Sequence, residues 1–178
     1  MDQDKLALKK LMKQKAVKTG AFTLSSGKTS DFYVDAKQVT LHPDGAYLVA
    51  KMILHKMNGL NAKHIGGLTI GADPIAAAAA LLSRETDSPV SAFIVRKAQK
   101  EHGLKKEIEG IITPGSDVVI VDDVITTASA TLTAIAAVEK IGCKVVKVIC
   151  LVDRQEGGSE ALCEYDFDPI FTKEELMK

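Results

Sequence analysis

The fold of this chain is decided by one stretch, Val118-Val119-Ile120-Val121-Asp122-Asp123-Val124-Ile125-Thr126-Thr127-Ala128-Ser129-Ala130-Thr131. It opens with four β-branched apolar residues, a run too short for a buried helix, directly after the turn signal Pro114-Gly115-Ser116-Asp117. Such a run predicts a strand that is buried on both faces. The strand is expected to stop on Asp122 and Asp123, and small residues then lead into a predicted helix over residues 130–142, which ends at a glycine. The unit is therefore strand, acidic pair, small-residue loop and helix.

The loop over residues 126–130 has the composition of an anion site. Its sequence is Thr-Thr-Ala-Ser-Ala, which offers hydroxyls and no bulk, next to the unpaired N–H groups of a helix start. This predicts a phosphate site. Asp122 and Asp123 beside it would repel an anion, so the ligand should also carry something positive, such as Mg²⁺ or a developing cation. The alternative is a strand end whose polar side chains only cap the helix.

Length and composition are those of one globular domain. The chain has 178 residues, 46% of them hydrophobic and 26% charged, and no apolar run approaches the roughly 18 residues of a membrane span. Its 23 basic and 23 acidic residues cancel, so no overall charge favours nucleic acid. The three cysteines lack metal-ligand spacing and are expected to be reduced thiols. The N-terminus lacks the pattern of a signal peptide, which favours the cytoplasm.

Strands and helices alternate along the chain. An amphipathic helix is expected over residues 4–18 and a hairpin over residues 20–35, so that roughly the first 40 residues contribute a helix and a small hood. The remaining expected elements are helices over residues 43–57 and 73–82, with Asp73 as an N-cap, strands over residues 64–68, 90–95, 145–152 and 169–171, and a short terminal helix. This alternation predicts a parallel α/β sheet. Ligands bind such sheets at the carboxyl ends of the strands, where the polar clusters of this chain fall.

Cations gather after the strand predicted over residues 90–95. Arg96 and Lys97 end this strand, and Lys100 and His102 follow in a polar surface loop. A departing diphosphate needs such cations to balance its charge, and a loop that closes over it excludes water. The alternative is a solvated charged face.

A further arginine, Arg154, follows the strand predicted over residues 145–152. Its guanidinium could fork onto a planar carboxylate or a pyrimidine oxygen. The alternative is an ion pair with Asp153 or Glu156.

These motifs resemble those of type I phosphoribosyltransferases, which use phosphoribosyl diphosphate (PRPP). The acidic pair and its loop resemble the PRPP-binding signature of that superfamily. Four other segments resemble the orotate phosphoribosyltransferase family: residues 22–35 its N-terminal hood, residues 67–76 its pyrophosphate loop, residues 96–103 its flexible catalytic loop, and residues 152–158 its orotate-side segment. The resemblance runs over most of the chain.

The resemblance implies an α/β fold with a central parallel sheet flanked by helices and a small N-terminal hood, in a single domain over residues 1–178. It implies a pentosyltransferase that moves ribose 5-phosphate from PRPP to N1 of orotate, giving orotidine 5′-monophosphate and diphosphate in pyrimidine synthesis. Mg²⁺ would bind mainly through PRPP and diphosphate, so no protein metal ligand is expected. Members are homodimers in which the loop over residues 97–106 would act in trans.

Individual roles follow from the same resemblance. The catalytic residues would be Lys100, His102, Asp122 and Asp123, with the two acids at the ribose hydroxyls and the cation-like centre. Thr126 and Arg154 would hold orotate. PRPP would be held by Arg96, Lys97, Lys100, His102, Asp122, Asp123, Val124, Ile125, Thr126, Thr127, Ala128, Ser129 and Ala130.

The chain departs from the family pattern at three positions. Many members carry glycine at the position of Ala128, and alanine there costs about 1 kcal/mol if the backbone has positive φ. Some bacterial members have lysine in place of Ser25 and of Gly71, so no contact is carried over to either. Two other functions are kept as alternatives: a phosphoribosyltransferase for another nucleobase, which has no evident use for Arg154, and a non-catalytic PRPP-binding regulator, which usually adds a DNA-binding region.

Overall fold

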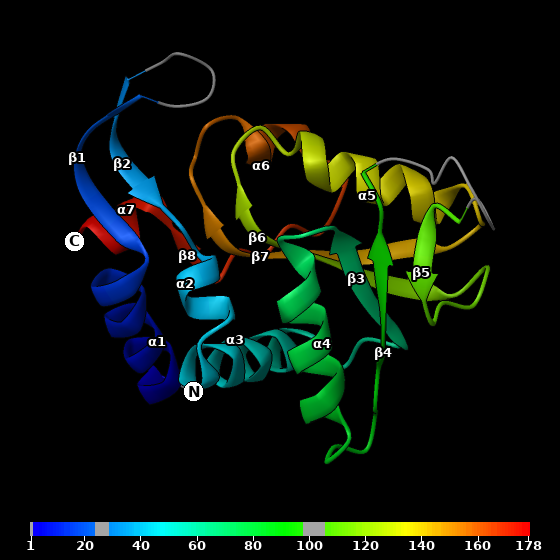
Figure 1. Ribbon diagram of the computed structural model, residues 1–178. Coiled ribbons are helices and arrows are strands. Elements are labelled where there is room, and N and C mark those ends of the chain that lie inside the picture. The colour runs from blue at the N-terminus through cyan, green and yellow to red at the C-terminus, as the bar shows by residue number, and fades with distance from the viewer. Residues whose placement is uncertain (1, 24–28, 98–105) are drawn as a thin grey trace.

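The apolar runs of the sequence become the strands of one central sheet (Figure 1). The computed structural model describes residues 2–23, 29–97 and 106–178. Within these residues the sheet has the strand order β5-β4-β3-β6-β7-β8, and only the β4–β5 pair is antiparallel. The strands are β3 (His64–Leu68), β4 (Ser91–Val95), β5 (Ile108–Gly110), β6 (Asp117–Ile125), β7 (Lys144–Asp153) and β8 (Phe171–Thr172). The stretch quoted first therefore runs through the middle of the molecule.

Helices cover both faces of this sheet, because parallel strands need long crossover connections. The helices α1, α3 and α4 pack on one face, and α5 and α6 on the other (Figure 1). Their bounds, with the two short helices α2 and α7, are α1 (Asp2–Lys15), α2 (Lys37–Thr40), α3 (Pro43–Lys56), α4 (Ala72–Ser83), α5 (Ser129–Glu139), α6 (Gly158–Ala161) and α7 (Lys173–Met177). The predicted α/β architecture is confirmed.

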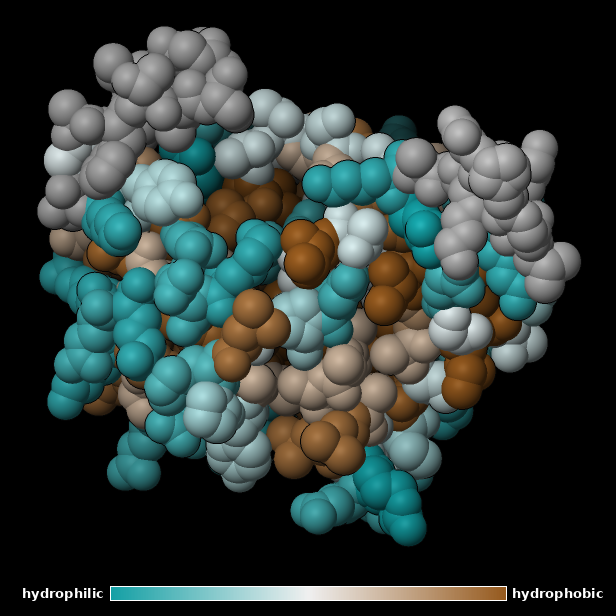
Figure 2. Space-filling model, viewed as in Figure 1, coloured by the Kyte–Doolittle hydropathy of each residue, from teal (hydrophilic) through white to brown (hydrophobic). Residues whose placement is uncertain are grey.

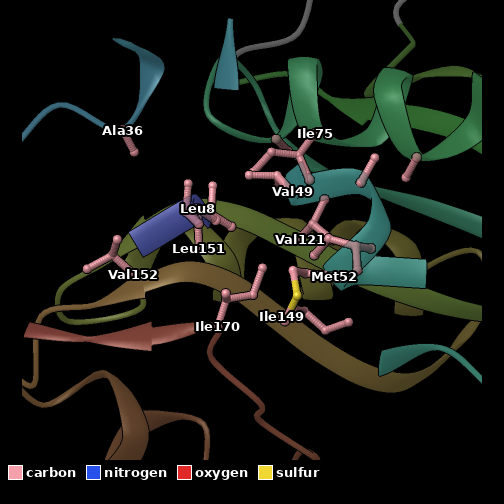
Figure 3. Close-up of a cluster of buried hydrophobic side chains, with 14 of the residues drawn as sticks. Leu8, Ala36, Val49, Met52, Ile75, Val121, Ile149, Leu151, Val152 and Ile170 are labelled. Carbon is pink, nitrogen blue, oxygen red and sulfur yellow. The ribbon is translucent and has the colours of Figure 1, made fainter. Parts of the chain in front are cut away.

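The alternation of side chains along β6 divides the core in two. Val119 and Val121 belong to the cluster under α1, α3 and α4, whereas Val118 and Ile120 belong to the cluster under α5. Figure 3 shows Val121 among side chains from the helices and from β7. All four β6 residues are almost completely buried, and each contributes about 1.5–3 kcal/mol of hydrophobic stabilisation. The prediction of a strand buried on both faces is confirmed.

The N-terminal hairpin forms a second, separate sheet. The strands β1 (Val17–Thr23) and β2 (Thr29–Val34) are antiparallel, and Val17 pairs with Val34. The chain then enters α2, which the sequence did not predict. The fully buried Phe32 and the buried Ala36 and Val39 fix the base of the hairpin and α2 to the core.

Other local expectations also differ from the structure: the first helix, expected to reach residue 18, ends at Lys15, and β1 begins at Val17. The edge strand β5 was not predicted, and it makes the sheet mixed at that edge. Asp73 is not the N-cap of α4. Gly71 has this role, with helical dihedrals of −63° and −43°, and Asp73 lies inside the first turn, where its Oδ2 accepts a hydrogen bond from Thr69 Oγ1 (2.8 Å). The last strand begins two residues later than expected, at Phe171.

Candidate active site

The two acids lie within a strand and not after it. β6 continues to Ile125, and Asp122, Val124 and Ile125 still pair with β7. The expectation that the strand stops on the carboxylates was therefore wrong. Backbone pairing between β6 and β7 continues beyond the apolar residues 118–121 as far as Ile125. Asp122 and Asp123 are only 7% and 6% exposed. Their backbone belongs to β6, so pairing with β7 fixes where the two acids lie.

Asp122 is held by neutral partners. Its Oδ1 accepts a hydrogen bond from the backbone N–H of Asp123 (2.9 Å), and its Oδ2 accepts one from Thr131 Oγ1 on α5 (3.1 Å). Burial, followed by the charge of Asp123, raises the pKa of Asp122 from 3.8 to about 7. Asp122 can therefore gain or lose a proton near neutral pH.

Asp123 has a cationic partner. Its Oδ1 accepts from the backbone N–H of Val124 (2.9 Å), and its Oδ2 forms an ion pair with Lys37 Nζ of α2 at 2.7 Å. Burial alone would lower the pKa of Lys37, but the hydrogen bond to Asp123 and its charge outweigh burial and raise it. The pair of acids is thus electrostatically unequal.

Gly71 lies against both carboxylates. A Cβ built at this position would be 2.5 Å from Asp123 Oδ1 and 2.7 Å from Asp122 Oδ1. The loop after β3 can approach the acids this closely only without a side chain. The sequence offered no pattern for this contact, and no role was assigned to Gly71.

The loop after β6 forms an open anion cradle. Ala128 has φ 63° and ψ 9°, so the left-handed backbone suspected at this alanine is present. α5 begins at Ser129 without a side-chain cap, which leaves its first N–H groups free to face a ligand. A cavity of about 390 Å³ lies here. It is lined by Leu68, Asp122, Val124, Ile125, Thr126, Thr127, Ala128, Ser129, Ala130, Thr131 and Thr133.

A second cavity of about 450 Å³ lies at the carboxyl ends of β3 and β4. It is lined by Thr69, Asp73, Ile94, Arg96, Lys97 and Glu109. Arg96 Nη1 pairs with Glu109 Oε1 at 3.5 Å, while buried Arg96 Nε and Asp73 Oδ1 have no hydrogen-bond partner among the residues described. Because buried polar atoms are normally hydrogen-bonded, these two atoms favour a polar ligand that would supply the missing partners. Lys100 and His102 lie outside the described residues, so their roles stay predictions.

Arg154 follows β7 and is nearly buried. Its backbone N–H donates to Ile125 O (2.9 Å), which places it beside the end of β6, and its Nη2 pairs with Glu156 Oε1 at 2.7 Å. The ion pair considered from the sequence is therefore formed, with Glu156. Asp153 is engaged elsewhere, accepting from Gln155 N–H and Ser159 Oγ.

The structure thus brings together most of the residues selected from the sequence. Arg96 and Lys97 line one cavity, Asp122 and residues 124–130 line the other, and Asp123 touches the loop between β3 and α4. Three contributors were missed: Lys37, Gly71 and Thr131. Lys37 and Gly71 approach the acids because of how distant segments pack, and Thr131 does so because of the direction in which its side chain leaves α5. Neither effect produces a local pattern in the sequence.

Among residues 2–23, 29–97 and 106–178, no three His, Cys, Asp or Glu side chains are grouped so that they could hold an ion.

Cys143, Cys150 and Cys163 are free thiols, and the first two are buried. No helix in the described part of the chain has the length and apolarity to span a membrane.

The acid pair, the open helix start and the second cavity, which Arg96 and Lys97 line, are the main features of the candidate site. The family model for the phosphoribosyl transferase domain matches residues 36–167, which include all of these elements. The chain is therefore a member of the phosphoribosyltransferase family.

Similarity to individual proteins narrows the family further. The orotate phosphoribosyltransferase of Aquifex aeolicus is 44% identical over 175 residues, which are 97% of this chain and 94% of that protein. That of Rhodopirellula baltica is 41% identical, over 92% of this chain and 88% of its own length. The crystal structure of the Mycobacterium tuberculosis orotate phosphoribosyltransferase in complex with PRPP has a TM-score of 0.83 at 32% identity, covering 98% of this chain and 99% of that one. The chain belongs to the orotate phosphoribosyltransferase group of this family.

Proposed function

We propose that the protein transfers ribose 5-phosphate from PRPP to orotate in the presence of Mg²⁺. The bond from ribose C1 to the diphosphate oxygen breaks, a bond from C1 to N1 of orotate forms, and the N1 proton is lost. The products are orotidine 5′-monophosphate and diphosphate, which places the reaction in pyrimidine nucleotide synthesis. The observation that carries the proposal is the pair of buried, unequal carboxylates beside the open start of α5.

Each part of the site has a use in this reaction. The free N–H groups and hydroxyls of residues 126–130 suit the 5′-phosphate. Asp122 and Asp123 can accept hydrogen bonds from the ribose hydroxyls and stabilise positive charge as it develops at C1. Arg96 and Lys97, with Lys100 and His102 as predicted, would hold the diphosphate. Thr126 and Arg154 would hold orotate, whose planar carboxylate matches a guanidinium fork.

Mg²⁺ would be held mainly through substrate oxygens, and the donor chemistry fits it: Asp73 Oδ1, a buried acceptor without a hydrogen-bond partner among the described residues, belongs to a residue that lines the second cavity. When bound, the ion would neutralise part of the diphosphate charge.

We also propose that the protein is a homodimer in which residues 97–106 of one subunit complete the site of the other. The face that carries α4 shows brown, hydrophobic surface in Figure 2. Leu81 on α4 is 78% exposed, and Ile70 and Tyr47 are also exposed. Leu81 and Tyr47 border an apolar groove of about 350 Å³. Surfaces of this kind are common at subunit interfaces.

The decisive experiment is the decrease of orotate absorbance with PRPP and Mg²⁺, run beside adenine, xanthine and uracil. Turnover of orotate alone supports the proposal. Asp122→Asn should abolish most of it, whereas Asp117→Asn, at the opposite end of the same strand, should leave it unchanged. Turnover of a purine alone would reassign the substrate. PRPP binding without turnover of any base, together with retardation of DNA, would favour a regulator.

A further inference from the structure

Lys37 is the first residue of α2, and its backbone is firmly placed. Its neighbours Ala36 and Val39 are buried, and its N–H donates to Asp35 Oδ1 (3.3 Å). α3 packs so tightly on α2 that a Cβ at Gly45 would lie 2.1 Å from Val39 O. The side chain of Lys37 extends from this fixed base to Asp123 Oδ2, 86 positions further along the sequence.

The partners of the two acids differ in kind. Asp122 is bonded to a backbone N–H and to the Thr131 hydroxyl, both of which are neutral. Asp123 is bonded to a backbone N–H and to the ammonium group of Lys37. Only Asp123 therefore has a cation in direct contact among the contacts described.

We infer that Lys37 is a positioning residue for the transfer reaction: its ammonium group holds the side chain of Asp123 in a fixed orientation beside Asp122. The inference rests on the proposed function and assigns a role within that site. The pKa of Asp122 is raised to about 7 by burial and then by the charge of Asp123, so it responds to the charges around the pair.

The contact is more than a solvated surface ion pair. The Lys37 side chain is 39% exposed, but that of Asp123 is only 9% exposed, so removing the ammonium group would leave a buried carboxylate without its counterion. The charged groups around Lys37 are Asp35, Asp122 and Asp123. The thiol of Cys150, paired with Asp122 on the neighbouring strand, stays neutral because burial raises its pKa well above the ordinary value.

The test compares Lys37→Met with Lys37→Arg and with Lys51→Met. Lys51 is a matched control: its side chain is 35% exposed and forms an ion pair with Asp4 at 2.9 Å, between α3 and α1. In Lys37→Met we expect kcat to fall about 10- to 100-fold, because the acid is misplaced, while the KM for orotate changes less than about twofold. Lys37→Arg should recover most of kcat, and Lys51→Met should resemble the wild type.

A second readout does not need turnover. In the ligand-free protein, ¹³C NMR titration of the Asp122 carboxyl should give a midpoint near pH 7 in the wild type and in Lys51→Met. Removal of the cation in Lys37→Met should raise this midpoint by about 1 unit, because an anionic pair is then harder to form. The acid limb of the kcat/KM profile should move in the same direction.

The outcomes separate the inference from the proposed function. Wild-type protein that turns over no orotate refutes the function, and the NMR titration still decides the role of Lys37. An unchanged Asp122 midpoint in Lys37→Met, or a kcat equal to that of the wild type, overturns the inference. If Lys37→Met does not fold, Lys37→Gln replaces it, since glutamine keeps a donor for Asp123 without the charge, and the same outcomes apply.

Discussion

Replacing Gly71 with alanine tests the geometry of the acid pair directly. The new methyl group would lie 2.5 Å from Asp123 Oδ1 and 2.7 Å from Asp122 Oδ1, so the nearer oxygen must withdraw by about 0.5 Å to reach a tolerable 3.0 Å. These same two oxygens each accept a backbone N–H at 2.9 Å. The carboxylates cannot yield without stretching those hydrogen bonds.

The magnitude follows from opposing contributions. Gly71 has helical dihedrals, so alanine fits the backbone and by itself would stabilise the protein by about 0.4–1 kcal/mol. Overpacking costs about 1–3 kcal/mol, and hydrogen bonds to charged groups contribute about 1.5–3 kcal/mol each. We expect a net loss of about 2 kcal/mol in the free energy of unfolding. A carboxylate displaced by a fraction of an ångström should lower kcat/KM by about 10²-fold.

Urea denaturation and initial-rate kinetics measure the two effects. The control is Gly59→Ala, where φ is +82° and no atom lies within 4 Å of the new Cβ. That change should cost about 1 kcal/mol through backbone strain, with no effect on kcat/KM. A Gly71→Ala protein as stable and as active as the wild type would show that the acids do not rest on this loop, and the reasoning would fail.

Substitutions at three further positions test other parts of the site. Ala128→Gly should change the free energy of unfolding by less than about 1 kcal/mol, because relief of the left-handed backbone is offset by loss of a buried methyl group, whereas Ala128→Val should destabilise by more than about 2 kcal/mol. Since the folded pKa of Asp122 lies above its unfolded value, the folded state binds more protons between pH 3.8 and about 7, and stability is lost as pH rises through that window. Asp122→Asn should therefore gain up to about 4 kcal/mol over the wild type in urea denaturation at pH 8, and little at pH 4. Arg154→Lys should raise the KM for orotate about 10- to 100-fold and leave the KM for PRPP within about twofold, since lysine cannot form a planar fork; an equal rise of both constants would contradict a role at the base.

The main strands could be predicted because their signal is local. β3, β6 and β7 are nearly continuous apolar runs, and the burial of β6 confirms that interpretation. β5 escaped prediction because it has three residues and depends on an antiparallel partner across the polar loop. The expected N-cap at Asp73 failed because Gly71 is already helical, which starts α4 two residues earlier than the Asp-Pro pattern suggests.

The grouping of the candidate site residues could be predicted where those residues are contiguous in the sequence. Asp122, Asp123 and the loop to Ala130 lie in one segment, so composition alone indicated a phosphate and a positive centre. Lys37 could not be found in this way, because its contact with Asp123 depends on how α2 packs. Thr131 stood inside the quoted stretch, but only the phase of α5 turns its hydroxyl towards Asp122. The sequence left open which acid would pair with Arg154, and the structure shows an ion pair with Glu156.

The continuation of β6 to Ile125 has a consequence for substitutions in the site. The acids that handle the sugar are embedded in the ladder with β7, whereas Arg154 stands one residue past its last pair, Ile125 with Asp153. Under the proposed function, Arg154, which would bind the base, thus lies beyond the paired strands, whereas the acids that would bind the ribose lie within them. A substitution at residue 154 can therefore change the contact with the base without breaking a pair of the β6–β7 ladder.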